Sequence, residues 1–167
     1  MERVSHPFPP LYNEASKVLV LGSFPSVKSR EAQFFYHHPQ NRFWKVISSV
    51  FDEQAPSTIE EKRNLLLRNR IAVWDVIQSC EIVGSADSSI KNVIPNDLSE
   101  ILATAKINQI ICNGSTSHQL YMKHIFPTTG LKALKLPSTS PANATCSLDC
   151  LVRDWSVLRT IIGAAKG

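Results

Sequence analysis

Short apolar runs alternate with longer amphipathic segments along the chain. Four of these runs hold aliphatic and β-branched residues over five or six positions, which is the pattern of a buried strand. Because segments with helical periodicity separate them, the pattern predicts an α/β protein with three α/β/α layers around a central four-stranded, mainly parallel sheet. The expected strands are Lys17–Leu21, Ile71–Val76, Ile107–Cys112 and Leu131–Leu136.

Five segments place apolar residues at the spacing of one helix face. The first segment, at about residues 43–51, has the clearest stripe of apolar residues, and we expect this face to pack on the sheet. A capping-box pattern at Ser57–Glu60 introduces the second, and Pro95 is expected to open the third. The expected helices span about residues 43–51, 57–69, 95–105, 116–126 and 148–161.

Composition narrows the class of protein. A chain of 167 residues fits one domain, residues 1–167, and 43% hydrophobic with 19% charged residues is typical of a globular protein rather than a disordered one. The amino terminus, MERVSHPFPP, has charges and prolines where a signal peptide is apolar, so we expect a cytoplasmic protein, associated with the nucleoid in a prokaryote. A net charge of +4 permits a polyanionic partner without requiring one.

The four cysteines show no spacing typical of a metal site. Cys80, Cys112, Cys146 and Cys150 form neither a C-x-x-C pair nor a Cys/His finger pattern. We therefore expect reduced, mostly buried thiols, and neither a metal nor an organic cofactor.

The candidate chemistry lies in loops that follow the expected strands, because ligands of open parallel sheets bind at the carboxyl ends of the strands. The loop after Gly22 is about twenty residues long, more than a plain connection needs, and holds three adjacent aromatics and two histidines. The loop Ser138–Asn143 is rich in hydroxyls and prolines and suits phosphate contacts, although an ordinary Ser/Pro turn has the same composition.

These two loops carry a family resemblance. G-S-F-P-S at 22–26, H-P-Q-N-R-F-W at 38–44 and L-P-S-T-S-P-A-N at 136–143 resemble motifs of the uracil-DNA glycosylase superfamily over about residues 18–155. The second motif is similar to that of the mismatch-specific uracil/thymine branch. Together with Phe24, the set looks more like the hypoxanthine-DNA glycosylase branch, often called the sixth family.

Two departures favour the hypoxanthine branch. Phe24 occupies the position at which similar uracil enzymes have an Asn or Asp that positions water. Leu136 occupies the position at which classical uracil enzymes have a His that stabilises the departing anion. In the hypoxanthine branch the catalytic Asn precedes Arg-Phe-Trp, which carries over to Asn41. Its amide does not titrate near neutrality, but its carbonyl oxygen can hold a water.

The resemblance also implies roles for other side chains. Asp75 is expected to accept the N1 proton of the base or, alternatively, to orient the water, although a strand-end Asp often only caps a turn. Tyr36 is expected to stack on the flipped base, with Phe35 as the competing candidate. The complete expected site has Asn41 and Asp75 as catalytic residues, Phe24, Tyr36, His38 and Asn113 at the base, and Arg42, Ser138, Thr139, Ser140 and Asn143 at the DNA.

The sequence thus predicts a monomeric, monofunctional DNA glycosylase that removes hypoxanthine from deoxyinosine in double-stranded DNA containing deaminated bases and leaves an abasic site. Neither motif contains a lysine that would suggest a lyase reaction. A uracil or mismatch glycosylase and a non-catalytic module that binds damaged DNA remain as alternatives.

Overall fold

The computed structural model describes residues 2–164, and its centre is a four-stranded sheet in which all neighbouring strands are parallel. The strands follow the order β3–β2–β6–β7, and the middle strand β2 aligns Val20 with Val73 on one side and with Ile111 on the other. The predicted four-stranded parallel sheet is therefore confirmed. Its strands are β2 Val18–Gly22, β3 Ile71–Asp75, β6 Gln109–Asn113 and β7 Ala133–Leu136.

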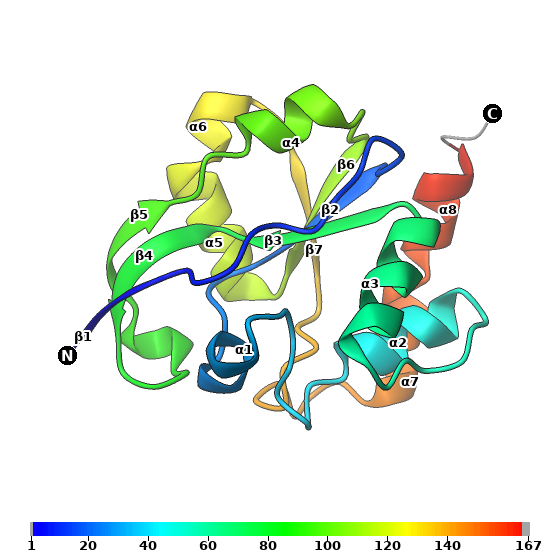
Figure 1. The fold of residues 1–167 in the computed structure, drawn as a ribbon, viewed down its shortest axis with the longest axis horizontal. Coiled ribbons are helices and arrows are strands. Elements are labelled where there is room, and N and C mark those ends of the chain that lie inside the picture. Colours follow the sequence, from blue (N-terminus) through cyan, green and yellow to red (C-terminus); the bar gives the residue numbers. More distant parts are fainter. Residues whose placement is uncertain (1, 165–167) are drawn as a thin grey trace.

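Alternate residues of the strands divide the core into two layers. Val18 and Val20 belong to the cluster under α2, α3, α7 and α8, whereas Leu19 and Leu21 belong to the cluster under α4 and α5. Figure 1 shows these two groups of helices on opposite sides of the sheet, which confirms the three-layer architecture. The helices are α1 Val27–Ala32, α2 Phe43–Val50, α3 Ile59–Arg68, α4 Ser99–Thr104, α5 Ser115–His124, α6 Phe126–Thr129, α7 Leu148–Trp155 and α8 Val157–Ala164.

A second, antiparallel sheet was not predicted. Its strands β1 Glu2–Ser5, β4 Ile77–Ile82 and β5 Lys91–Pro95 have the order β1–β4–β5, so β5 is an edge strand. The expectation that Pro95 opens a helix is wrong, because Pro95 ends β5 opposite Ile77 and the helix begins only at Ser99. A proline is tolerated there because an edge strand can lack one backbone donor.

Two expected helices are each divided. The segment 116–126 becomes α5 and α6, with the break at Ile125, and 148–161 becomes α7 and α8 around Ser156. The capping box lies one residue later than expected, with Thr58 as the N-cap and Glu61 as its reciprocal partner.

The expectation that all cysteines are reduced is wrong for one pair. Cys146 and Cys150 form a disulfide across one helical turn at the start of α7, where their Cα atoms are 5.5 Å apart. Asp154 lies near both sulfurs, but bonded sulfurs offer no thiolate to a metal. Cys80 and Cys112 are free and fully buried. Among the described residues no helix is long and apolar enough to cross a membrane.

Candidate active site

A cavity of about 520 Å³ lies where the four parallel strands end. It is closed on one side by residues 85–88, which connect the antiparallel strands β4 and β5, and on another by the loop after β7. In Figure 1 the segments that follow β2 and β7 come together at this end of the sheet. Of the residues expected in the site, Phe24, Tyr36, His38, Asn41, Asp75, Asn113, Ser138, Thr139 and Ser140 line the cavity, and Arg42 and Asn143 do not.

The amide of Asn41 is oriented by two hydrogen bonds to its carbonyl oxygen. The backbone N–H of Phe43 donates to Oδ1 over 2.9 Å, and the hydroxyl of Thr139 donates to the same atom over 2.9 Å. Because a backbone N–H can only donate, the first bond fixes which end of the amide is oxygen. Both lone pairs of Oδ1 are used, so the expected water on that oxygen has no place. Within residues 2–164 the NH₂ group has no hydrogen-bond partner and is the end available to a ligand.

Thr139 connects two of the expected site residues and is itself completely buried. Its backbone N–H donates to Oδ1 of Asn113, and the Asn113 amide donates back to the Thr139 hydroxyl, both over 3.0 Å. The expectation that Thr139 contacts DNA is therefore wrong, because its hydroxyl points inward to Asn41 and Asn113. Asn113 keeps one N–H for a base or a water.

Arg42 was expected at a phosphate, and the structure gives it a different role. Its guanidinium donates to the backbone carbonyls of Cys146, Ser140 and Asn143 over 2.5, 3.0 and 2.9 Å. Both terminal nitrogens are thus bound within the protein, and Nε is buried without a partner. Arg42 fixes the shape of the loop 138–146 instead of facing the solvent.

The serines of this loop keep their hydroxyl protons available. The Oγ atoms of Ser138 and Ser140 accept backbone N–H bonds from Ser140 and Ala142, each over 3.1 Å. A hydroxyl that accepts in this way can still donate its proton to an anionic oxygen. Asn143, by contrast, uses its amide inside the loop, donating to the Ser138 carbonyl and accepting from Thr145.

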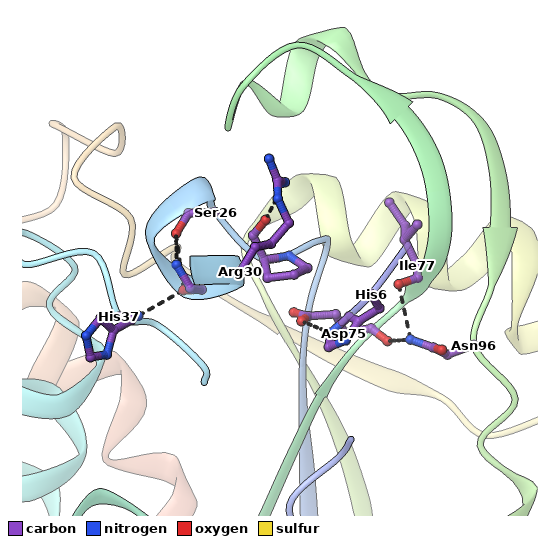
Figure 2. Close-up of polar contacts among 9 residues, drawn as sticks. His6, Ser26, Arg30, His37, Asp75, Ile77 and Asn96 are labelled. Atoms are coloured by element: carbon purple, nitrogen blue, oxygen red, sulfur yellow. Dashed lines mark hydrogen bonds and ion pairs between the residues drawn. The ribbon is translucent and has the colours of Figure 1, made fainter. Parts of the chain in front are cut away.

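Asp75 ends β3 and is 4% exposed. Its Oδ2 lies 2.7 Å from Nε2 of His6, and both side chains are almost wholly buried. Figure 2 shows this pair, with the Asn96 amide bonded to the backbone beside it. The other oxygen, Oδ1, lies against Gly22, where any added Cβ would collide with it. Because Gly22 has no side chain, it leaves room for this oxygen of the Asp75 carboxylate.

His6 was missed by the sequence analysis. It lies 69 residues from Asp75 and in no motif, so no local spacing connects the two. The one signal in the sequence was a histidine at the start of residues 6–11, which are otherwise apolar and rich in proline.

The aromatic residues of the long loop separate into core and cavity positions. Phe34 and Phe35 are 3% and 2% exposed, although the edge of Phe35 still reaches the cavity. Tyr36, in the left-handed region at φ 49°, stacks one ring face on Phe43 with centroids 4.1 Å apart. Its hydroxyl is buried without a partner near Gly22, and burial together with the charge of Asp75 raises the pKa of Tyr36.

The remaining candidates have local contacts. Phe24 is 8% exposed and lies under the Arg30 guanidinium, 5.5 Å from its ring centroid. His38 accepts the backbone N–H of Gln40 through Nδ1. Asp87, a second carboxyl on the cavity wall, was not predicted. Its Oδ1 accepts from the Ser23 hydroxyl over 3.0 Å, and partial desolvation of the carboxyl at the cavity wall, reinforced by the charge of Asp75, raises its pKa although the residue as a whole is exposed.

Comparison with known proteins identifies the family of this chain. Residues 9–159 match the model of the family described as the uracil DNA glycosylase superfamily. Hypoxanthine DNA glycosylases from Methanosarcina acetivorans and Methanosarcina barkeri are 33% and 32% identical over 138 residues, which are 81% of this chain and 86% of each relative. A solution NMR structure from Methanosarcina acetivorans, described as a candidate uracil DNA glycosylase, is 31% identical with a TM-score of 0.78, covering 92% of this chain and 96% of that one.

Proposed function

The chain belongs to the uracil DNA glycosylase superfamily, and from this premise we propose that it is a DNA glycosylase that hydrolyses the N-glycosidic bond of deoxyinosine and releases hypoxanthine. The observation that supports a deaminated base over adenine is a pair of unused polar atoms beside Gly22, the Oδ1 of Asp75 and the hydroxyl of Tyr36, and the similar hypoxanthine DNA glycosylases support hypoxanthine among such bases. One accepts and the other can donate, so together they suit a base edge that presents a donor next to an acceptor.

Hypoxanthine presents such an edge. Its N1–H can donate to Asp75 and its 6-oxo group can accept from Tyr36, whereas adenine has an acceptor at N1 and an amino donor at C6. Adenine would place its N1 lone pair against the Asp75 carboxylate and leave that buried acceptor without a donor, which disfavours adenine in a polar site. Guanine shares the N1–H and 6-oxo edge, but its stable pair with cytosine makes flipping more costly.

The reaction we propose is direct attack by water at the sugar. Breaking the bond builds positive charge on the deoxyribose and negative charge on the leaving base, so the enzyme positions water and accommodates the anion. Asn41 would hold the water through its NH₂ group. Among the described residues that line the cavity there is no lysine to form a Schiff base, which supports a monofunctional enzyme that leaves an abasic site.

DNA is the partner of such an enzyme. The hydroxyls of Ser138 and Ser140 are the donors that we propose for backbone phosphates, carried on a loop that Arg42 keeps in shape. We further propose that a single glycosylase domain acts as a monomer on double-stranded DNA containing deaminated bases. We propose a cytoplasmic location, on the nucleoid if the source is a prokaryote.

Single-turnover cleavage of matched duplexes tests the proposal. Each duplex carries one deoxyinosine, one deoxyuridine or one deoxyxanthosine, and alkali reveals abasic sites. Excision of hypoxanthine well above uracil is expected. Uracil as the best substrate would identify a uracil or mismatch glycosylase, and tight binding of the inosine duplex with no excision would identify a recognition module.

A further inference from the structure

We infer that His6 is a positioning residue for Asp75: it holds Oδ2 of the carboxylate so that Oδ1 faces the bound base. The inference rests on the proposed function, since it concerns how that cavity reads the base. The contact is between Nε2 of His6 and Oδ2 of Asp75, 2.7 Å apart, with side-chain exposures of 3% and 5%. A carboxylate this deeply buried needs a donor, and His6 supplies it from the segment that follows β1.

The surroundings of His6 fix both its position and its tautomer. Its ring packs on Phe8 with centroids 4.5 Å apart, and rings of Phe24, Phe35 and Trp74 lie within 6.4 Å. Nδ1 is buried without a partner. Because a carboxylate oxygen accepts, the 2.7 Å contact places a proton on Nε2, which donates to Asp75.

The backbone of Asp75 is held independently of its side chain. Asn96, itself 6% exposed, donates through Nδ2 to the carbonyls of Asp75 and Ile77 over 2.9 and 3.1 Å, as Figure 2 shows. The Val76 N–H donates to the Gly22 carbonyl over 2.8 Å. With the main chain fixed between the two sheets, the remaining freedom of Asp75 is rotation of its carboxyl group, and His6 removes it.

This arrangement assigns different tasks to the two carboxylate oxygens. Oδ2 is satisfied inside the protein, whereas Oδ1 lies beside Gly22 and the unpaired Tyr36 hydroxyl with no partner of its own among the described residues. A preorganised acceptor of this kind loses no rotational freedom when the base arrives. Loss of the His6 donor would let the carboxyl group rotate away from the base.

A double-mutant cycle tests the inference through single-turnover excision of hypoxanthine. His6→Leu should slow excision roughly 10- to 100-fold, the usual effect of removing a residue that orients a functional ligand. In an Asp75→Asn background the same change should have little further effect, because His6 acts through the carboxylate. His6→Gln keeps an N–H donor at a similar reach and should recover part of the rate.

Arg3→Leu is the matched control. Arg3 also ties the first strand to its neighbours, donating to the Asn92 carbonyl and the Ser79 hydroxyl, but it does not line the cavity. It should lower thermal stability without slowing excision. Equal losses of excision in Arg3→Leu and His6→Leu, a wild-type rate in His6→Leu, or the same fold-loss with and without Asp75 would overturn the inference.

Failure of the proposed function would look different. A wild-type protein that excises no hypoxanthine would contradict the proposed glycosylase function directly. The same cycle is then measured on binding of an inosine-containing duplex relative to its adenine-containing counterpart. Coupling between His6 and Asp75 in that preference supports the inference, and its absence overturns it.

Discussion

At the scale of single residues, the hydrogen bonds already present decide what each candidate can still do. The carbonyl oxygen of Asn41 is saturated by Phe43 and Thr139, so only its NH₂ group can act on a ligand. An NH₂ group donates to the water oxygen and cannot take its proton. Asn41 is thus suited to orienting a water for attack on a sugar that is already losing its bond, not to deprotonating it.

Asn41→Asp separates this function from the structural one. Asp keeps the oxygen that accepts from Phe43 and Thr139, so stability should stay close to that of the wild type, whereas excision should fall because the NH₂ group is gone. Asn41→Ala loses both, and should in addition lower the free energy of unfolding by about 1 kcal/mol, the usual net contribution of a hydrogen bond. Single-turnover excision and thermal unfolding measure the two effects. Normal excision by Asn41→Asp would remove the NH₂ group from the mechanism.

At the scale of elements, prediction succeeded where the signal was local. The strands β2 and β3 are almost continuous apolar runs, and β2 and β6 are both followed by their expected loops. The strands β4 and β5 were missed because β4 follows β3 after one residue, so the two read as one run, and because Pro95 resembles a helix start. Only the pairing of Pro95 with Ile77 on a sheet edge reveals its role.

The loop 138–146 gives the element-scale prediction. Arg42→Met removes the donor to three loop carbonyls, so it should lower the free energy of unfolding by about 2 kcal/mol and weaken DNA binding through a looser loop. The dependence of log affinity on log salt should keep its slope, since no phosphate contact is lost. A slope smaller by about 1 would show that Arg42 does bind a phosphate. Arg153→Met removes the same charge from an exposed side chain and should leave stability unchanged.

At the scale of the whole molecule, the cavity is assembled from both sheets and from distant parts of the chain. The motifs at 22–26, 38–44 and 136–143 predicted most of its wall, because each follows or precedes an element with a clear pattern. His6 and Asp87 could not be predicted. Asp87 reaches the cavity, and His6 reaches Asp75, only because the antiparallel sheet packs beside the parallel one, and no periodicity in the sequence encodes those contacts.

Thiol counting tests the core layer that holds Cys80 and Cys112 together with the disulfide. Cys80 and Cys112 are fully buried, and burial raises the pKa of Cys112 to about 12, so neither should react with an aromatic disulfide reagent in the native protein. Denaturation without reductant should expose two thiols, and reduction should raise the count to four, because Cys146 and Cys150 are bonded. Four thiols without reduction would contradict the disulfide.

The carboxyl of Asp87 on the cavity wall gives a prediction about the stability of the whole protein as a function of pH. Partial desolvation of the Asp87 carboxyl on the cavity wall, with the nearby charge of Asp75, raises its pKa above the ordinary 3.8 although the residue as a whole is exposed, so the unfolded chain ionises first as pH rises. The stability that the neutral carboxyl contributes is complete below that ordinary value and is lost as pH rises through the higher folded pKa. Asp87→Asn cannot ionise and can still accept from Ser23, so it should unfold at a higher temperature than the wild type at pH 7.

Thermal unfolding from pH 3 to pH 8 measures this difference. The advantage of Asp87→Asn should vanish at the acid end, where the wild-type carboxyl is also neutral. Asp97→Asn is the control, because the Ser99 N–H lowers the pKa of Asp97 and its loss of charge should bring no gain at neutral pH. An Asp87→Asn variant no more stable than the wild type at pH 7 would show that folding does not disfavour ionisation of the Asp87 carboxyl. If the gain is found, the cavity keeps two acidic groups at a cost in stability, which is the pattern expected of a site selected for chemistry.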